Sequence, residues 1–216
     1  VHGNQQAVSN QACGTKAAAW YVLTVPANGS VTVRLRLSSQ TIANPFADFS
    51  QIMQKQKDNA DAFYAEKQTA LVSADAKAVQ RQAWAGMLWS KQFYYYNVNK
   101  WLNGDAGQPS PPIGHQQGRN RDWRHLIAGD VISMPDKWEY PWFAAWDLAF
   151  HCIALAPIDP DFAKNQLLLL VEDRYMHPNG QLPAYEWNFS DVNPPVHAIA
   201  AWKVYQKDLE INGKGD

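Results

Sequence analysis

Met134–His151 reads MPDKWEYPWFAAWDLAFH, and this stretch decides how the rest of the chain is interpreted. It brings tryptophans and carboxylates close together: Asp136, Trp138, Glu139, Trp142, Trp146 and Asp147. Burying an unpaired carboxylate costs free energy, so a helix that served packing alone would normally omit such residues. Aromatic side chains stack on the apolar faces of sugar rings, while carboxylates bind sugar hydroxyls or exchange protons with a glycosidic oxygen. The composition of the stretch therefore indicates a sugar-binding site.

The overall composition restricts the kinds of partner. The chain has 216 residues, 46% of them hydrophobic, which is enough for one domain or for one domain with part of another. Its 19 basic and 20 acidic residues nearly cancel, which argues against a nucleic acid or a membrane surface bound through bulk charge. A neutral ligand, such as a small oligosaccharide or glycoside, fits this balance better.

The two cysteines, Cys13 and Cys152, lie far apart and show no zinc-site spacing, so we expect no disulfide framework, metal or cofactor. Cys152 is expected to be a buried thiol. No apolar run approaches the roughly 18 residues of a membrane helix, and no signal segment opens the chain. The expected location is cytoplasmic, although an upstream segment with an export signal stays open because the chain begins at Val1.

Residues 1–43 differ from the rest of the chain. Ala19–Val25 and Ser30–Leu37 are rich in β-forming residues, and the Pro26–Gly29 segment between them is a turn signal. An isolated hairpin is only marginally stable in water. We therefore expect residues 1–43 to be the tail of an upstream β domain, or a sheet packed on the helices.

The remainder predicts a mainly α fold. Residues 44–73 contain a narrow apolar stripe typical of a linker helix, and residues 74–211 predict a series of packed helices. Capping and proline signals set the expected helices. They run from Ser73 to about Leu102, Pro141 to Ala156, Asp159 to about Met176, and Asn193 to about Tyr205.

Residues 103–140 show no periodicity and contain many prolines and glycines. A loop of this length in a compact domain is usually functional, or its assignment as a loop is mistaken. Its Arg, Asn, Trp and His residues favour a functional loop. The alternative is a loop held by ion pairs, such as Arg121 or Arg124 with Asp122 or Asp130.

Short connections make successive helices antiparallel, which predicts one rim rich in loops. This rim collects the 103–140 loop, the start of the helix at Pro141, the 177–193 loop and the start of the last helix. Five of the ten tryptophans fall in or beside it: Trp123, Trp138, Trp142, Trp146 and Trp187. The concentration is typical of an active-site rim on a helical toroid.

Packing alternatives stay open for several of these residues. Trp142 and Trp146 have the i, i+4 spacing of a packing pair, and Asp147 and His151 have the same spacing as a helix-surface pair. His197 lies on an Ala-rich helix, where a histidine with satisfied hydrogen bonds is commoner than a ligand.

Met134–His151, with the preceding GRNRDWRHLIAGDVIS and the following HPNGQLPAYEWNFSDVNPPVHA, resembles the start of the catalytic domain of bacterial glycoside hydrolase family 63 proteins, relatives of processing α-glucosidase I. The resemblance covers roughly Ala83 to Tyr205. It implies a β-sandwich, a linker and an (α/α)6 barrel. It also implies an inverting mechanism on an α-glucosidic or related α-glycosidic bond.

The resemblance assigns the general acid to Asp147, within Trp146-Asp147-Leu-Ala-Phe150-His151. The family's general base is a glutamate from the second half of the barrel, which this chain does not include. The chain is therefore expected to be an internal fragment whose partner is the remainder of its parent chain. It is expected to be inactive alone.

The residues expected to bind substrate are Arg119, Asn120, Trp138, Glu139, Trp142, Trp146, Tyr185, Glu186, Trp187 and Asp191. Trp138, Trp142 and Trp187 are the expected stacking platforms. Glu186 and Asp191 are assigned to sugar hydroxyls or to orienting neighbours rather than to the base, and Asp191 also has the alternative of bracing a turn.

A general acid must hold its proton near neutral pH. A helix N-terminus favours the anion by about 0.3–1 kcal/mol, whereas burial can raise a carboxyl pKa by up to about 3–5 units. We therefore expect a raised pKa for Asp147. Two other classes of function stay open: a carbohydrate-binding helical domain without catalysis, and a helical scaffold for protein interactions.

Overall fold

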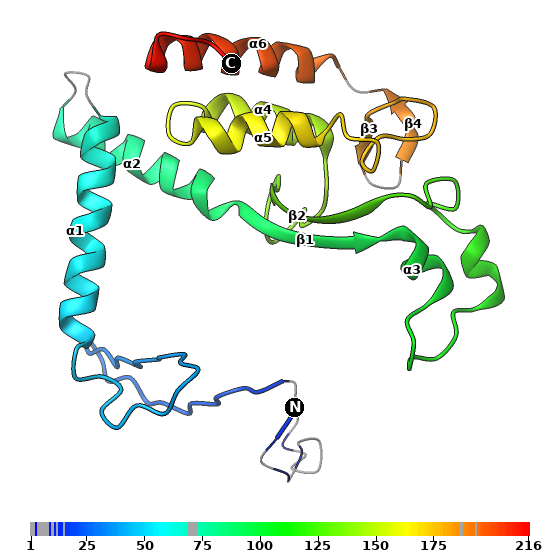
Figure 1. Ribbon diagram of the computed structural model, residues 1–216. Helices are drawn as coiled ribbons and strands as arrows, with labels where there is room; N and C mark the ends of the chain where they lie inside the picture. The colour runs from blue at the N-terminus through cyan, green and yellow to red at the C-terminus, as the bar shows by residue number, and fades with distance from the viewer. Residues whose placement is uncertain are drawn as a thin grey trace. The chain divides into compact units, whose positions relative to one another are not determined.

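The computed structural model describes residues 3, 9, 11, 13, 14, 16–68, 73–185, 188–192 and 194–216. For residues 183–185 and 188–192 it describes the backbone only. The chain divides into two compact units, Val1–Asp58 and Asn59–Asp216. The division falls within helix α1 (Phe49–Lys67). The described secondary structure is mainly helical (Figure 1), as the sequence predicts, with two small sheets of two strands each.

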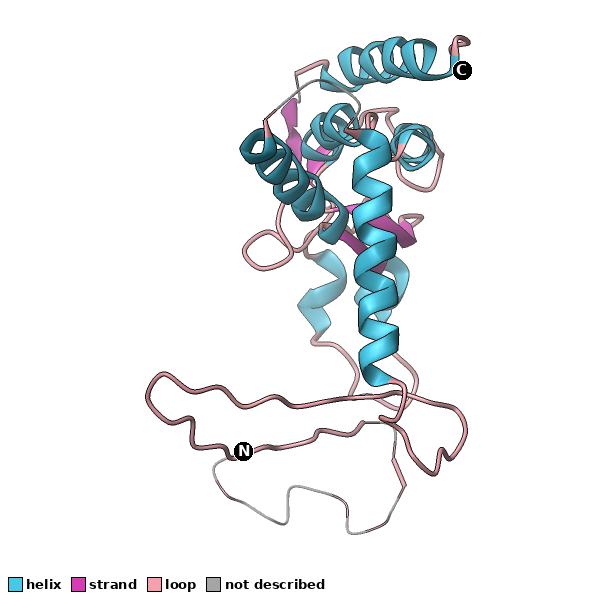
Figure 2. Ribbon diagram, turned by 90° about the vertical axis from the view of Figure 1, so that its left-hand side faces the viewer, coloured by secondary structure: helices cyan, strands magenta, loops and turns pink. Residues whose placement is uncertain are grey.

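The predicted N-terminal strands are wrong. Ala19–Val25 and Ser30–Leu37 form no strand ladder and are exposed, and Figure 2 draws them as loop. The turn between them does form, since the Gly29 N–H donates to the Pro26 carbonyl at 3.0 Å. Two β-rich segments without a larger sheet to join gain too little from pairing to form stable strands. The assignment of residues 1–43 to an upstream β domain stays a prediction.

The first two helices follow their sequence signals. The expected linker helix is present as α1, and α2 spans Ala74–Trp89. The Ser73 hydroxyl accepts a hydrogen bond from the Ala76 N–H at 3.2 Å, which confirms Ser73 as the N-cap. Local hydrogen bonding alone therefore fixes where α2 begins. The domain boundaries at residues 44, 73 and 211 stay predictions.

The prediction that α2 continues to Leu102 is wrong. Strand β1 (Lys91–Asn97) follows it and pairs antiparallel with β2 (Ile127–Ser133), with Lys91 opposite Ser133. β1 contains four consecutive aromatic residues, Phe93–Tyr96, which prefer a pleated, half-buried surface to a helix. Phe93 is exposed and the next residue, Tyr94, is half-buried against the core, as the alternation of a strand requires.

Residues 103–140 are not a single loop, which corrects the second large assignment. Helix α3 (Val98–Asn103) ends where the sequence predicts, at Gly104, and a 3-10 turn, η2 (Ile113–Gln117), follows it. Strand β2 then occupies Ile127–Ser133. The strand was missed because its pairing partner, β1, had been assigned to a helix.

The last three helices are α4 (Ala145–Leu155), α5 (Pro160–Leu169) and α6 (Val196–Asn212). Asp159 caps α5 as predicted, because its Oδ1 accepts from the Phe162 N–H at 3.1 Å. Three boundaries differ from the prediction: α4 begins four residues after Pro141, α5 ends before Met176, and α6 continues beyond Tyr205. Asn193, the expected start signal of the last helix, lies outside the described residues.

Two short strands interrupt the 177–193 connection. β3 (Pro183–Tyr185) pairs antiparallel with β4 (Asn188–Val192). Together with the turn at Gly180, whose N–H donates to the His177 carbonyl at 2.8 Å, they connect α5 to α6. The expected loop therefore contains a small hairpin.

Helix α4 is the centre of the core. Its mean hydropathy is high, and Leu148, Ala149, Cys152 and Leu155 are fully buried. Helices α5 and α6 pack against it, side by side in Figure 1. Burial raises the pKa of the Cys152 thiol to about 12, so the cysteine is a packed core residue, as expected.

A buried glutamine joins this helical layer to the sheet. The Gln166 Oε1 of α5 accepts from the Ser133 N–H at 3.0 Å, and its Nε2 donates to the Val131 carbonyl at 3.0 Å. Gln166 therefore satisfies backbone groups on β2 that have no partner strand on that edge. No helix of the described residues is long and apolar enough to cross a membrane.

Gln166→Leu is expected to lower the free energy of unfolding by about 1–3 kcal/mol, because it leaves the buried Ser133 N–H without an acceptor. Urea denaturation followed by tryptophan fluorescence measures the change. Asn165→Ala, on the exposed neighbouring position, is the control and is expected to change stability by less than about 0.5 kcal/mol. Equal effects of the two substitutions would contradict the bridging role of Gln166.

Candidate active site

The segment before α4 is shaped by one carboxylate. Asp136 Oδ1 accepts from the Glu139 N–H at 2.8 Å and from the Trp138 N–H. These backbone bonds lower the pKa of Asp136, which makes it a turn residue that is ionised near neutral pH. The turn presents Trp138 and Glu139 at the surface, and Trp138 is 90% exposed.

The remaining tryptophans of the segment lie deeper. Trp142 precedes α4 and makes an edge contact with Tyr140, with ring centroids 5.3 Å apart. Trp146 is half-buried against the core and makes an edge contact with Phe150, with ring centroids 6.2 Å apart. Trp142 and Trp146 are therefore not an i, i+4 pair on one helix, because α4 begins only at Ala145.

Asp147 lies in the first turn of α4, and its side chain is half-buried. Burial raises the pKa of its carboxyl, while the charge of His151 and the backbone N–H at the helix start act in the opposite direction. The direction agrees with the expectation from the sequence, since desolvation outweighs the helix N-terminus. Asp147 thus keeps a proton more readily than Asp136 of the same stretch.

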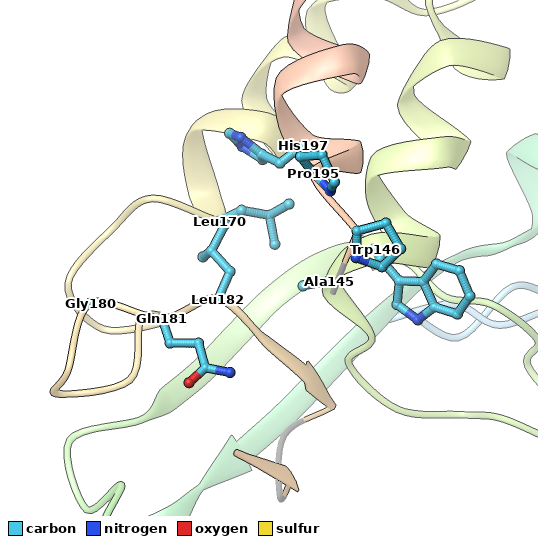
Figure 3. A pocket seen from close by; sticks show the side chains of 9 residues that line it. Ala145, Trp146, Leu170, Gly180, Gln181, Leu182, Pro195 and His197 are labelled. Atoms are coloured by element: carbon cyan, nitrogen blue, oxygen red, sulfur yellow. The ribbon is translucent and has the colours of Figure 1, made fainter. Parts of the chain in front are cut away.

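A pocket of about 360 Å³ opens beside this helix start (Figure 3). It is lined by Ala145, Trp146, Leu170, Gly180, Gln181, Leu182, Pro194, Pro195 and His197. The starts of α4 and α6, the end of α5 and the 180–182 turn thus meet at one place, which brings together three of the four parts of the predicted rim but not the 103–140 segment. The sequence did not indicate Leu170 or Leu182, because nothing in an apolar residue's local pattern shows which cavity it faces.

His197 lines this pocket while its ring is already engaged. Its Nε2 lies 3.0 Å from the Leu167 carbonyl, across the contact between α6 and α5. This hydrogen bond supports the reading of His197 as a packed histidine that joins two helices.

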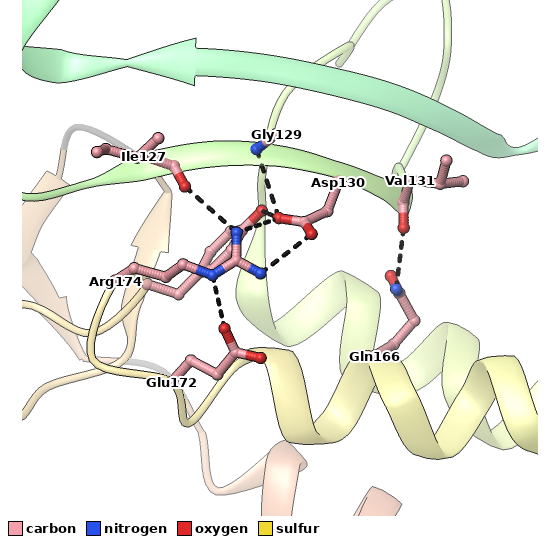
Figure 4. A network of polar contacts seen from close by, with 8 residues as sticks. Ile127, Gly129, Asp130, Val131, Gln166, Glu172 and Arg174 are labelled. Carbon is pink, nitrogen blue, oxygen red and sulfur yellow. Dashed lines mark hydrogen bonds and ion pairs between the residues drawn. The ribbon is translucent and has the colours of Figure 1, made fainter.

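A polar network holds the segment that follows α5 to strand β2 (Figure 4). Arg174 donates through Nη2 to Asp130 Oδ1 at 3.0 Å and through Nε to Glu172 at 2.6 Å. The buried Tyr175 hydroxyl donates to Asp130 Oδ2 at 2.9 Å. Arg174, and then the Tyr175 hydroxyl, lower the pKa of Asp130, so this carboxylate stays ionised.

The partners expected for Asp130 were different. Arg121 pairs with its neighbour Asp122 at 3.4 Å on the surface, and Asp130 pairs with Arg174 instead. Arg174 went unrecognised because it lies 44 positions away in sequence. Trp123 belongs to the same junction: it is fully buried, and its Nε1 donates to the Met176 carbonyl at 3.1 Å.

Arg119 and Asn120 lie before this junction, in residues 118–126. Arg119 is exposed, and its guanidinium lies 5.9 Å from the Trp101 ring centroid. Asn120 is buried, has a φ of 66° and donates to the Tyr96 hydroxyl at 2.6 Å. The structure thus gives Asn120 a packing contact, while substrate binding by both residues stays a prediction.

The other expected substrate contacts belong to the β3–β4 segment. Tyr185 ends β3 and Asp191 lies in β4, which places both backbones on the connection that forms the rim. Glu186 and Trp187 lie outside the described residues. Across the described part of the chain, no group of three His, Cys, Asp or Glu side chains is arranged to hold a metal ion.

Part of the chain is similar to a known glycoside hydrolase domain. Residues 140–213 match the family described as the mannosylglycerate hydrolase MGH1-like glycoside hydrolase domain. The match contains α4, α5 and α6, and therefore Trp142, Trp146 and Asp147. It supports a glycosidase-type enzyme and agrees with the predicted resemblance at the level of glycoside hydrolases.

A relative is similar to the whole chain. The uncharacterized protein YMR196W of Saccharomyces cerevisiae is 46% identical over 228 residues, an alignment that covers all of this chain. The chain spans 21% of the length of the yeast protein. No solved structure shows a significant match.

Asp130→Asn is expected to lower the free energy of unfolding at pH 7 by about 1 kcal/mol, since Arg174 is partly exposed and solvent screens the pair. The folded-state pKa of Asp130 lies below its unfolded value of about 3.9. The ion pair therefore stabilises the fold above about pH 4, and this contribution is lost as the pH falls through the folded-state pKa. The free energies of unfolding of the wild type and of Asp130→Asn, measured by urea denaturation, should approach each other as the pH falls below about 4.

Asp122→Asn is the matched control, because its contact with Arg121 is exposed. It is expected to leave stability unchanged at all pH values. A stability deficit of Asp130→Asn that persisted undiminished at pH 2 would contradict the assigned ion pair.

Proposed function

We propose that this chain is part of an inverting glycoside hydrolase, similar to family 63 enzymes, that cleaves an α-glucosidic or related α-glycosidic bond. The observation that carries the proposal is the half-buried carboxyl of Asp147 in the first turn of α4, where burial raises its pKa. It lies next in sequence to Trp146, which lines the pocket, and within the segment that matches a glycoside hydrolase domain.

Asp147 acts as the general acid. Its proton passes to the glycosidic oxygen as the bond to the anomeric carbon breaks, and the leaving group departs as an alcohol. A water molecule attacks from the opposite face of the sugar and loses its proton to a carboxylate roughly 6.5–9.5 Å away. We assign this base to the remainder of the parent polypeptide, which leaves the present chain inactive alone.

The protonated state of Asp147 follows from two opposing effects. The positive end of α4 favours the carboxylate by about 0.3–1 kcal/mol. Desolvation favours the neutral acid, and it is the larger effect on this side chain. The carboxyl can therefore carry a proton into the substrate complex at a pH where Asp136, stabilised by backbone N–H donors, does not.

Substrate binding uses the aromatic and polar groups around the pocket. Trp146 borders the pocket directly, and the exposed Trp138 offers a stacking surface on the preceding turn. Glu139, Glu186 and Asp191 are assigned to sugar hydroxyls, and Trp142, Tyr185 and Trp187 to the aromatic wall. The name of the matched family adds mannosylglycerate to the α-glucosides as a substrate to test.

Asp147→Asn in the full-length protein is expected to reduce hydrolysis of an unactivated α-glycoside by about 10²–10⁴-fold, since the leaving oxygen loses its proton donor. The loss should be much smaller for an aryl α-glycoside whose leaving group departs without protonation. Initial rates on small α-glucosides and α-mannosides measure both effects, and proton NMR reports whether the first product has the inverted anomeric configuration.

Two further results have definite meanings. Near-native turnover of unactivated substrates by Asp147→Asn would refute the assignment of the acid. Binding of α-glycosides in calorimetry without turnover by the full-length protein would instead favour the carbohydrate-binding domain. Glu186→Gln is the comparison variant, and it is expected to weaken binding while keeping turnover.

A further inference from the structure

A histidine lies on the same face of α4 as Asp147. His151 follows it by one helical turn, so the two side chains are i, i+4 neighbours. The His151 ring is half-buried, and its Nδ1 lies 2.9 Å from the Ser133 hydroxyl at the end of β2. The ring is therefore fixed from outside its own helix.

The anchor of this histidine is itself rigid. Ser133 is 1% exposed, and its N–H donates to Gln166 Oε1, while the 4% exposed Gln166 also donates to the Val131 carbonyl. Strand β2, helix α5 and helix α4 thus meet in one hydrogen-bonded chain that ends at His151. Moving the ring would break a bond in a buried network.

The order Ser133, His151, Asp147 resembles the parts of a nucleophilic triad, but the burial of the hydroxyl excludes that role. A nucleophilic serine must reach the substrate, and Ser133, the last residue of β2, is buried with its N–H bound to Gln166 of α5. The hydroxyl is instead placed to hold the imidazole. The half-buried Asp147 lies one helical turn before His151, where the hydrogen-bonded chain ends.

We propose that His151 is a positioning residue for Asp147: clamped to Ser133, its ring fixes the surroundings of the carboxyl one helical turn away. The inference rests on the proposed function of Asp147 as the general acid. It gives the Ser133–Gln166 network an influence on the protonation of Asp147. This influence acts through His151, and the network itself is not assigned a substrate contact.

The electrostatics agree with this geometry. Burial lowers the pKa of His151, although the charge of Asp147 acts in the opposite direction. A cationic ring at this place would lower the pKa of Asp147 and remove the proton that the reaction needs. Neutral His151 and protonated Asp147 therefore support one another.

Charged groups on the neighbouring elements are engaged with other partners. Within the described part of the chain, Asp147 is the charge that acts on the His151 ring. Ion pairs elsewhere in the same compact unit include Lys91 of β1 with Asp159, Arg81 of α2 with Asp61, and Lys164 of α5 with Asp208 of α6. A change of charge at His151 is thus expected to act first on the pKa of Asp147.

The test compares the pH dependence of kcat/KM for an unactivated α-glycoside in full-length variants. His151→Lys places a permanent cation one turn from Asp147. The pH at which kcat/KM declines on the basic side of its profile, the basic limb, is expected to fall by about 1–2 pH units. At pH 7 kcat should fall about tenfold, with KM changed less than twofold. His151→Gln, which is neutral and can still bond Ser133, is expected to keep the limb within about 0.3 units.

Ser133→Ala keeps His151 and removes only its clamp, so it tests the proposal even if His151→Lys fails to fold. It is expected to reduce kcat about three- to tenfold, while KM and the midpoint temperature of thermal unfolding of the full-length protein change little. His115→Gln, on the separate η2 turn, is the control and should leave the pH profile unchanged.

A basic limb that stays in place in His151→Lys, or a wild-type kcat in Ser133→Ala, would overturn the positioning role. The Asp147→Asn variant separates this failure from the larger one. If Asp147→Asn loses activity while the His151 and Ser133 variants behave as wild type, only the present inference fails. If Asp147→Asn keeps activity on unactivated substrates, the proposed function fails with it.

Discussion

The two hydrogen bonds of the Gln166 side chain connect the sheet to the helices, and the geometry around α4 depends on this connection. An amide has both an acceptor and a donor, so one buried side chain serves a backbone N–H and a backbone carbonyl on the same strand. This fixes the end of β2 against α5. Because Ser133 lies at that end, the same contact determines where His151 is held.

Under the proposed function, the start of α4 combines two requirements that oppose each other. A helix N-terminus attracts negative charge, while a carboxyl that donates a proton must remain neutral. The structure resolves this through burial, which raises the pKa of Asp147. Asp136, only eleven positions earlier, accepts backbone N–H donors in an exposed turn, and these lower its pKa. Two carboxylates of one short segment thus acquire different chemistry from their surroundings.

Local signals predicted several helix ends correctly. Ser73 and Asp159 cap α2 and α5 because a cap needs only the side chain and the next three residues. The assignments that failed depend on distant partners. Lys91–Asn97 is a strand because Ile127–Ser133 pairs with it, and Ala19–Val25 and Ser30–Leu37 are not strands because they lack a sheet in the described residues. The four consecutive aromatic residues Phe93–Tyr96 of β1 were the signal that could have shown the strand.

The sequence by itself determined the mainly helical class, the aromatic and acidic character of Met134–His151, and Asp147 as the candidate acid. The first two follow from residue types and short spacings, whereas Asp147 as the candidate acid is what the resemblance to glycoside hydrolase family 63 implies. The tertiary structure decided that Asp130 pairs with Arg174, that Gln166 and Ser133 hold His151, and that Trp146 borders a pocket with His197. Burial and long-range hydrogen bonds depend on which segments meet in space, and no local pattern contains that information.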